Sequence, residues 1–269
     1  HNRHVRHCGA DFLTDAELLP AGSKLTPARV ALAISAGHSH LAVRRLPRIA
    51  IIDSGDELAA DPLACAIHQI PASNGVMLAA MLAELPCTVQ RLGPVADRIE
   101  DLVDALERAA SADIIVTTGG ASVGDHDLIR PALAQWGAQL DFWKVAMKPG
   151  KPLMVASRGS QIVIGLPGNP VSSHVTALLF LLPLVRALSG AAAPLPRAMT
   201  MKLASELKPG GSRREFLRGR ITGAGVEALL RQDSGALAAL AAADVIIDRP
   251  AEGPALPAGT EVPVYLLAN

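Results

Sequence analysis

Apolar runs alternate with helical repeats along the middle of the chain. Residues 48–52 are apolar after Arg48 and are bounded by Pro47 and by Ser54-Gly55, which indicates a buried strand. Further strands are expected at 88–92, 113–117, 140–147 and 161–164. Helices are expected at 74–85, with Ser73 or Asn74 as N-cap, at 99–106, where apolar residues recur at i, i+3, i+4 and i+7, and at 128–136. This alternation predicts a doubly wound α/β fold whose mostly parallel sheet carries helices on both faces.

The periodicity changes near residue 191. A linker is expected at 191–196, followed by short β-like segments at 199–203, 215–217, 245–247 and 262–267, with a short helix or turn at 236–243. We therefore divide the chain into three parts. Residues 1–46 are interpreted as the remnant of a preceding β-rich domain or as a linker, 47–190 as the α/β domain, and 191–269 as a small, mostly β domain.

Composition narrows the class of protein. Half of the residues are hydrophobic but only 3% are aromatic, so the core must consist of Ala, Leu, Val and Ile. A formal net charge of zero argues against a nucleic-acid binder. Three cysteines without CxxC spacing predict neither a disulfide framework nor a zinc site. The longest apolar stretch, 175–188, contains Pro183 and is too short for a membrane span. These features favour a cytoplasmic protein that does not enter a membrane.

A glycine-rich loop carries the strongest local signal. Residues 117–127 read TTGGASVGDHD and lie between a predicted strand and a predicted helix. In an open α/β sheet, ligands bind beyond the carboxyl ends of the strands. Paired glycines there let the backbone approach a ligand, and successive N–H groups can bind a phosphate. The simpler interpretation is a tight turn, but the loop is longer and more polar than a turn requires.

Carboxylates follow two of the predicted strands. Asp53, Asp56 and Glu57 end the first strand, and Asp125 and Asp127 end the third. Because parallel strands end at the same edge of a sheet, these groups can meet, and a Mg²⁺ shared with a phosphate would relieve their repulsion. The competing interpretation is that each carboxylate only caps a helix. We favour the metal for Asp56 and Asp125, and helix capping for Asp127 and Glu57.

Two further motifs predict anion binding. Residues 147–152 read MKPGKP, and the Pro-Gly turn directs the positive charges of Lys148 and Lys151 toward one anion. Residues 165–170 read GLPGNP and place a tight turn at the start of a long helix, with Asn169 as N-cap and Pro170 at the first position. Together with the glycine-rich loop, these motifs describe a pocket for a phosphorylated ligand. The candidate residues in the second motif and the helix are Pro167, Gly168, Asn169 and Ser172.

Several common chemistries lack their motifs. No G-x-x-x-x-G-K-[ST] loop occurs, and no G-x-G-x-x-G follows a strand. P-loop kinases and dinucleotide dehydrogenases are therefore disfavoured. His126 and His174 are interpreted as ordinary surface or core histidines.

The ordered motifs resemble the MoeA/gephyrin E-domain family of molybdopterin molybdenumtransferases. The resemblance rests on SGDEL, TTGGASVGDHD, MKPGKP and GLPGNPVS in this order, and on GSRREFLRG at 211–219 and Gln232-Asp233-Ser234 nearer the C-terminus. It implies a molybdopterin-binding α/β domain followed by a C-terminal β domain. It also implies insertion of molybdate into adenylylated molybdopterin with release of AMP, a requirement for Mg²⁺, and a homodimer in the full-length form.

Site residues carry over from the family motif by motif. Asp56 and Asp125 would hold the cation and the nucleotide phosphate, while Lys148 and Lys151 would face molybdate; these four are the expected catalytic residues. The remaining binding residues in the glycine-rich loop and the small domain are Thr118, Gly119, Gly120, Ser122, Gly124, Arg213 and Ser234.

Two acidic positions of the family pattern are replaced here. Ala10 stands where the family usually has Glu in Gly-Glu-Asp, and Ala72 where it has Asp in Tyr-Asp-Thr-Asn. These replacements leave open a molybdopterin-binding carrier or regulator without turnover. An interaction scaffold, a role that gephyrin's E domain fills for receptor tails, is a third hypothesis and requires an exposed apolar groove.

Overall fold

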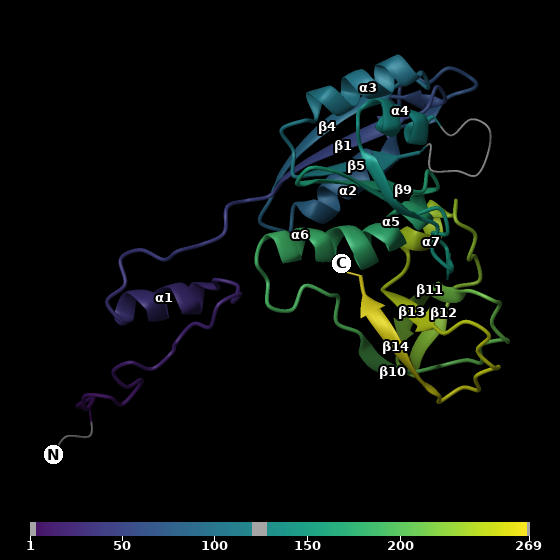
Figure 1. The fold of residues 1–269 in the computed structure, drawn as a ribbon. Coiled ribbons are helices and arrows are strands. Elements are labelled where there is room, and N and C mark those ends of the chain that lie inside the picture. Colours follow the sequence, from purple (N-terminus) through teal and green to yellow (C-terminus); the bar gives the residue numbers. More distant parts are fainter. Residues whose placement is uncertain (1–3, 120–127, 268–269) are drawn as a thin grey trace.

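The alternating strands and helices fold into a six-stranded sheet in the computed structural model, which describes residues 4–119 and 128–267 (Figure 1). Strands β1, β4, β5 and β9 are parallel, and β8 and β6 continue the sheet in antiparallel pairing. The order across the sheet is β4 (Thr88–Val95), β1 (Arg48–Ser54), β5 (Ile114–Thr118), β9 (Gln161–Leu166), β8 (Met154–Arg158) and β6 (Gln139–Trp143).

Helices cover both faces of this sheet. Strand β1 shows why: Ala50 and Ile52 pack into the cluster under α3 (Ile99–Arg108) and α4 (Ile129–Gln135). Ile49 and Ile51 pack into the opposite cluster, under α2 (Ser73–Leu82) and the long helix that begins at Pro170. Side chains alternate across a strand, so an all-apolar strand requires a helical layer on each side. The predicted doubly wound α/β class is confirmed.

The long helix is longer than the apolar pattern indicated. It runs through α5 (Pro170–Thr176), a π-helical segment η1 (Ala177–Leu181) and α6 (Leu182–Leu188) without a break at Pro183. A local π-helical segment is one way in which a helix accommodates a proline. By length and a mean hydropathy of 1.7 the 19 residues could cross a membrane, but 56% of the apolar window is buried in the fold. The helix is therefore a core helix of the α/β layer.

A second sheet forms the C-terminal part. Its order is β10 (Met199–Lys202), β14 (Glu261–Leu266), β13 (Val245–Arg249), β11 (Arg214–Thr222) and β12 (Gly225–Ala228). Its core is aliphatic, and the short helix α7 (Leu237–Ala241) contacts α5. The expected small, mostly β region is confirmed. Strand β7 (Met147–Lys148) belongs to the α/β part by sequence but pairs in parallel with β11.

The two parts share an apolar interface. Met147, Val171 and Val175 of the α/β part pack with Phe216, Leu240 and Ile246 of the C-terminal part. This interface fixes the C-terminal sheet against the start of the long helix. Polar groups near the helix start therefore come from both parts of the chain.

Residues 4–46 extend away from the sheets (Figure 1). They contain helix α1 (Pro27–Ser35), which begins after the N-cap Thr26, and no strand occurs between residues 4 and 46. Two small strands, β2 (Leu58–Ala59) and β3 (Ile70–Pro71), pair with each other after β1. Arg45 attaches the end of the extended segment to the sheet through two hydrogen bonds of 2.7 Å to the Asp113 carboxylate.

Several local predictions were wrong. The expected strand 140–147 is interrupted where Lys144 adopts a φ of 78°, so β6 and β7 are separate and join different sheets. Strands β8 and β12 were missed. Ala72, not Ser73 or Asn74, is the N-cap of α2, and Asn169 caps α5 without a side-chain hydrogen bond. The Asn74 side chain instead bonds to another turn, as the site geometry shows.

Candidate functional site

The carboxyl ends of β1 and β5 carry a buried polar cluster. The Thr118 hydroxyl donates to Asp53 Oδ1 at 2.6 Å, and both side chains are 2% exposed. Arg91 Nη2 lies 3.7 Å from Asp53 Oδ2. A Cβ on Gly75, in the first turn of α2, would overlap the Asp53 carboxylate, so only glycine admits it there. Because the Thr118 hydroxyl already donates to Asp53, it is not available to an anion. Backbone N–H groups are then the anion donors at this strand end.

Two of the predicted glycine segments lie side by side. Gly119 has a φ of 97°, and a Cβ at this position would stand 2.6 Å from the Ser54 carbonyl oxygen. A Cβ on Gly168 would lie 3.5 Å from the Gly119 Cα. Asn74 Nδ2 donates to the Gly168 carbonyl oxygen at 2.6 Å, which fixes the turn. The start of the glycine-rich loop and the 165–170 turn therefore meet at one edge of the sheet, as the motifs predict.

Part of the predicted site lies outside the described residues: Gly120, Ser122, Gly124 and Asp125. The structure does describe Asp56, which is exposed and accepts a hydrogen bond of 3.0 Å from the Asp97 backbone N–H. Within residues 4–119 and 128–267, no three His, Cys, Asp or Glu side chains gather as a metal site would require. The proposed metal role of Asp56 and Asp125 therefore stays a prediction.

The lysine turn after β7 lies against the start of the long helix. Gly150 has a φ of 107°, and a Cβ there would stand 2.6 Å from the Thr176 methyl carbon, so the turn fits closely on α5. Lys151 is exposed, and the Lys148 side chain is 52% exposed. Arg213 Nη1 donates to the Met147 carbonyl oxygen at 3.3 Å. The turn and Arg213 together bring three cationic side chains to the junction of the two parts.

A buried carboxylate lies behind Lys148. Glu215 is 7% exposed, and its Oε1 accepts from Lys148 Nζ at 3.3 Å. Its Oε2 accepts from Arg249 Nη1 at 3.4 Å, and Arg249 is 4% exposed. The positive charges of Lys148 and Arg249 compensate the buried negative charge of Glu215, whereas an isolated buried charge would be strongly destabilising. None of the sequence motifs indicated this contact, because it depends on the pairing of β7 with β11.

The loop 229–235 is held by the side chains of Arg218 and Gln232. Arg218 is fully buried, and its Nη2 donates to the carbonyl oxygens of Arg231 at 2.7 Å and Asp233 at 3.0 Å. Burial lowers the pKa of the Arg218 guanidinium from its usual value. Gln232 accepts from the Arg218 N–H at 3.0 Å and donates to the Arg218 carbonyl oxygen at 2.9 Å. These bonds define the backbone path that leads to Ser234.

Ser234 caps the long helix from the C-terminal part. Its carbonyl oxygen accepts from the Val171 N–H at 3.1 Å, so this first-turn N–H is not available to an anion. Of the predicted residues around this helix start, Pro167 and Ser172 are buried, whereas Gly168 and Asn169 are exposed. The exposed pair and Gly119 are the backbone positions that a phosphate could approach from solvent.

Next to Ser172 and Ser173, His174 faces a small apolar cavity of about 240 Å³ between α2, α5 and α7. Burial lowers the pKa of His174 to about 4. Its Nδ1 has no hydrogen-bond partner among the described residues. Since a neutral imidazole is the stable form here, His174 is a core histidine at the junction of the two parts, as the sequence suggested.

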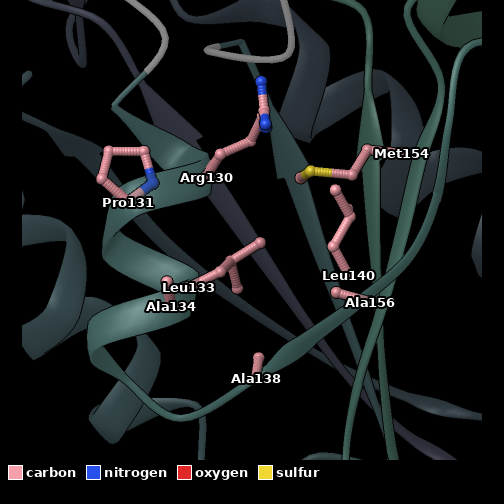
Figure 2. A pocket seen from close by; sticks show the side chains of 8 residues that line it. All are labelled: Arg130, Pro131, Leu133, Ala134, Ala138, Leu140, Met154 and Ala156. Carbon is pink, nitrogen blue, oxygen red and sulfur yellow. The ribbon is translucent and has the colours of Figure 1, made fainter.

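A larger cavity of about 400 Å³ lies elsewhere. It is bounded by α4, β6 and β8, and Arg130 stands at its rim (Figure 2). The other lining residues are apolar: Pro131, Leu133, Ala134, Ala138, Leu140, Met154 and Ala156. None of the described site residues contributes to it. The Arg130 guanidinium is already stacked 4.5 Å from the centre of the Trp143 ring, so it is not directed at a ligand.

The junction thus combines backbone groups suited to phosphate with cations suited to an oxyanion. The first set comes from Gly119, Gly168 and Asn169, and the second from Lys148, Lys151 and Arg213. Sequence reasoning missed Asn74 and Glu215 as residues that shape the site, because their roles depend on contacts 94 and 67 residues apart. Asp53 was expected among the carboxylates at the end of the first strand, but its hydrogen bond with Thr118 was not.

Two family models match the chain. A model described as a probable molybdopterin binding domain covers residues 50–187, and one described as the MoeA C-terminal region (domain IV) covers residues 200–267. The two matches coincide with the two sheets. They also contain the candidate residues on both sides of the junction.

Curated and solved proteins agree with this match. A molybdopterin molybdenumtransferase of Nostoc is 35% identical over 222 residues, which cover 81% of this chain and 51% of that protein. Molybdopterin molybdenumtransferase 2 of Mycobacterium tuberculosis is 31% identical over 281 residues, covering 98% of this chain and 67% of that one. The crystal structure of a MoeA protein from Pyrococcus horikoshii has a TM-score of 0.80 at 27% identity, covering 93% of this chain and 61% of its own. The chain thus spans from about half to about two thirds of these relatives.

Proposed function

The chain belongs to the MoeA/gephyrin E-domain family of molybdopterin molybdenumtransferases, and from this premise we propose that it acts in molybdenum cofactor biosynthesis. Its substrate would be adenylylated molybdopterin, bound at the carboxyl edge of the parallel sheet. Molybdate would be inserted into the pterin dithiolene and AMP released.

One observation carries the proposal. Gly119 and the 167–169 turn meet at the carboxyl edge of the sheet, and the Lys148–Lys151 turn lies on the same long helix that this turn begins. Glycine backbone at such an edge suits a phosphate, and compact ammonium groups suit an oxyanion. An apolar ligand would interact with neither the glycine backbone nor the ammonium groups. A phosphorylated pterin would bind the first through its phosphate, and molybdate would bind the second.

The protein's own residues would act mainly by binding and charge stabilisation. Backbone N–H groups at the strand ends would hold the phosphates, and Lys148 and Lys151, with Arg213, would attract molybdate toward the dithiolene. Two sulfur–molybdenum bonds form as the two dithiolene thiols lose their protons, and one molybdenum–oxygen bond breaks so that this oxygen leaves with the two protons as water. In the hydrolytic step, water attacks the adenylate phosphorus, the phosphoanhydride bond breaks, and AMP leaves as the second product. Preorganised cations lower the cost of the charge that gathers on these oxygens.

Mg²⁺ enters the proposal through the two carboxylates assigned by motif. Asp56 alone does not make a divalent metal site, because one of its oxygens accepts from the Asp97 N–H and the described residues hold no cluster of ligands. Magnesium usually takes few protein carboxylates together with substrate phosphates and water. We therefore assign it Asp56 and Asp125 with the phosphates of the bound substrate, where it would neutralise part of the phosphate charge during hydrolysis.

Cytoplasmic location and a homodimer in the full-length form complete the proposal. Both are implied by the family, and a composition without a disulfide pattern also favours the reducing cytoplasm. Size-exclusion chromatography with light scattering measures the second point directly. A mass of one chain, 27.9 kDa, at micromolar concentration would contradict a dimer formed by this chain alone.

The direct test is binding followed by turnover. Purified chain is titrated with adenylylated molybdopterin and Mg²⁺ in a calorimeter, and AMP is quantified after molybdate is added. We expect binding and molybdate-dependent AMP release. Lys148→Met should lower the rate about 100-fold, by analogy with removal of one preorganised donor, while Lys202→Met on β10 should not change it. Binding without release would mean a carrier, and no binding by folded protein would refute the assignment.

A further inference from the structure

We propose that Glu215 is a positioning residue that holds the ammonium group of Lys148 in place for the oxyanion, so that the C-terminal sheet sets the geometry of the site. This inference rests on the proposed function for what Lys148 binds, but the contact itself is a property of the chain. Glu215 belongs to β11, whereas Lys148 precedes it by 67 residues and belongs to β7.

Strand pairing brings the two residues together. Strand β7 pairs in parallel with β11, with Met147 opposite Arg214 and Lys148 opposite Glu215. Arg213, just before β11, adds a hydrogen bond of 3.3 Å to the Met147 carbonyl oxygen. The backbone of the lysine turn is therefore an extension of the C-terminal sheet. A lysine built on that extension takes its position from the sheet rather than from the α/β part alone.

The Glu215 side chain is fixed from behind. Its Oε2 lies 3.4 Å from Arg249 Nη1, and the two side chains are only 9% and 5% exposed. Arg249 is in turn anchored by its Nη2, which donates to the carbonyl oxygens of Lys208, Gly253 at 3.4 Å and Pro254 at 3.5 Å. A carboxylate held this way has few rotamers open to it. Its second oxygen is then a fixed acceptor for the Lys148 ammonium group.

Lys148 meets this acceptor with a long, flexible side chain. Its Nζ lies 3.3 Å from Glu215 Oε1 while the side chain stays 52% exposed. An ammonium group has three donors, so one can point to Glu215 and the others outward to a ligand. Without the carboxylate, the four-carbon side chain of Lys148 populates many rotamers. Ordering it again for each turnover costs conformational entropy, which raises the barrier to reaction. Lys151 lies on the other side of the turn and provides an internal comparison.

Kinetics separate positioning from simple stabilisation. Glu215→Gln keeps the shape and removes the charge, Glu215→Asp keeps the charge, and Glu227→Gln on the exposed side of β12 is the control. We expect Glu215→Gln to lower kcat for molybdate-dependent AMP release about 10- to 100-fold, as displacements of about 1 Å do. The dissociation constant of adenylylated molybdopterin should change less than about threefold. Glu215→Asp should recover part of the rate, and the control should match the wild type.

A second readout does not depend on activity. Lysine acetylation at neutral pH, followed by mass spectrometry, gives the labelling rate of Lys148 relative to Lys151 in the same molecule. We expect this ratio to rise at least about threefold in Glu215→Gln, since the ion pair no longer shields the amine, and to stay unchanged in Glu227→Gln. Thermal unfolding tests whether each variant is folded. If Glu215→Gln is not folded, Glu215→Asp takes its place, because its shorter side chain draws the carboxylate back from Lys148. Its labelling ratio should lie between that of the wild type and the rise of about threefold expected for Glu215→Gln.

The outcomes distinguish the two proposals. A folded wild type that neither binds the substrate nor releases AMP would refute the proposed function, and the labelling ratio would then decide the role of Glu215 alone. An unchanged labelling ratio in Glu215→Gln, or an unchanged kcat in an active enzyme, would overturn the inference. Equal losses of binding and kcat, without recovery in Glu215→Asp, would reduce Glu215 to a residue that only stabilises the fold.

Discussion

His174 makes the junction of the two parts sensitive to acid. Its ring lies among the apolar side chains of Met77, Leu237 and Leu240, and burial lowers its pKa to about 4 from the ordinary 6.5. A histidine whose pKa is lower in the folded than in the unfolded state favours folding above pH 6.5. As the pH falls from 6.5 to 4, the unfolded chain takes up the proton first, so stability is lost across this window.

The magnitude follows from the two pKa values. A difference of about 2.5 corresponds to about 3 kcal/mol at full effect, and to about 2 kcal/mol between pH 7 and pH 4.5. This loss is a sizeable part of the 5–15 kcal/mol that is typical of the stability of a folded domain. The variant His174→Leu removes the titrating group and keeps a side chain of similar size in an apolar surrounding, so it should remove this part of the acid sensitivity.

Urea denaturation measures the effect. The free energy of unfolding is determined at pH 7 and pH 4.5 for the wild type, for His174→Leu and for His68→Leu, a substitution of an exposed histidine. We expect the pH-dependent loss to be smaller by about 2 kcal/mol in His174→Leu than in the other two proteins. Equal losses in all three would refute the argument that His174 is buried in its neutral form.

Three further perturbations test other parts of the structure. Gly119→Ala should destabilise the protein by about 1–3 kcal/mol and abolish ligand binding, because its φ of 97° and the Ser54 carbonyl oxygen leave no room for a Cβ; a urea titration together with calorimetry checks both. Arg45 lowers the pKa of Asp113 to about 2, so this carboxylate stabilises the fold above its ordinary pKa, and the effect is lost as the pH falls from about 4 to 2. The Asp113→Asn variant should be less stable at pH 7, and in acid denaturation its free energy of unfolding should vary less across that window. Chelation with EDTA should stop AMP release, and Asp56→Asn should raise the Mg²⁺ concentration needed to restore it, whereas a rate independent of Mg²⁺ would remove the metal from the proposal.

The alternation of elements could be predicted because it depends on local patterns. Strand β1 has one apolar residue after another, and α3 repeats Ile99, Leu102 and Leu106 at helical spacing, so their types followed from the sequence. Strand β8 could not be separated from its surroundings, since Met154-Val155-Ala156 is a short apolar run with no period of its own. The break after β6 depends on the positive φ of Lys144, an unusual conformation for lysine that no composition rule indicates.

The site was predicted in its motifs but not in its connections. Gly119 and Gly168 could be expected at one sheet edge because both follow parallel strands. The acceptor for Lys148 could not be expected, because Glu215 reaches it only through the pairing of β7 with a strand of the other sheet. The start of the long helix looked like an open anion site, but the Ser234 carbonyl oxygen already occupies the Val171 N–H. Such contacts depend on pairing between strands far apart in the sequence, and this pairing cannot be predicted from the local patterns of a single sequence.

The central claim is the location of the ligand, and hydrogen–deuterium exchange tests it most directly. Exchange in the chain is compared with and without saturating adenylylated molybdopterin. Protection is followed in two peptides at the proposed site, 165–173 and 228–236. Two further peptides, 131–140 and 154–158, line the apolar cavity of Figure 2. We predict slower exchange in the first pair and no change in the second. Protection confined to the cavity peptides would contradict a site at the carboxyl edge of the sheet.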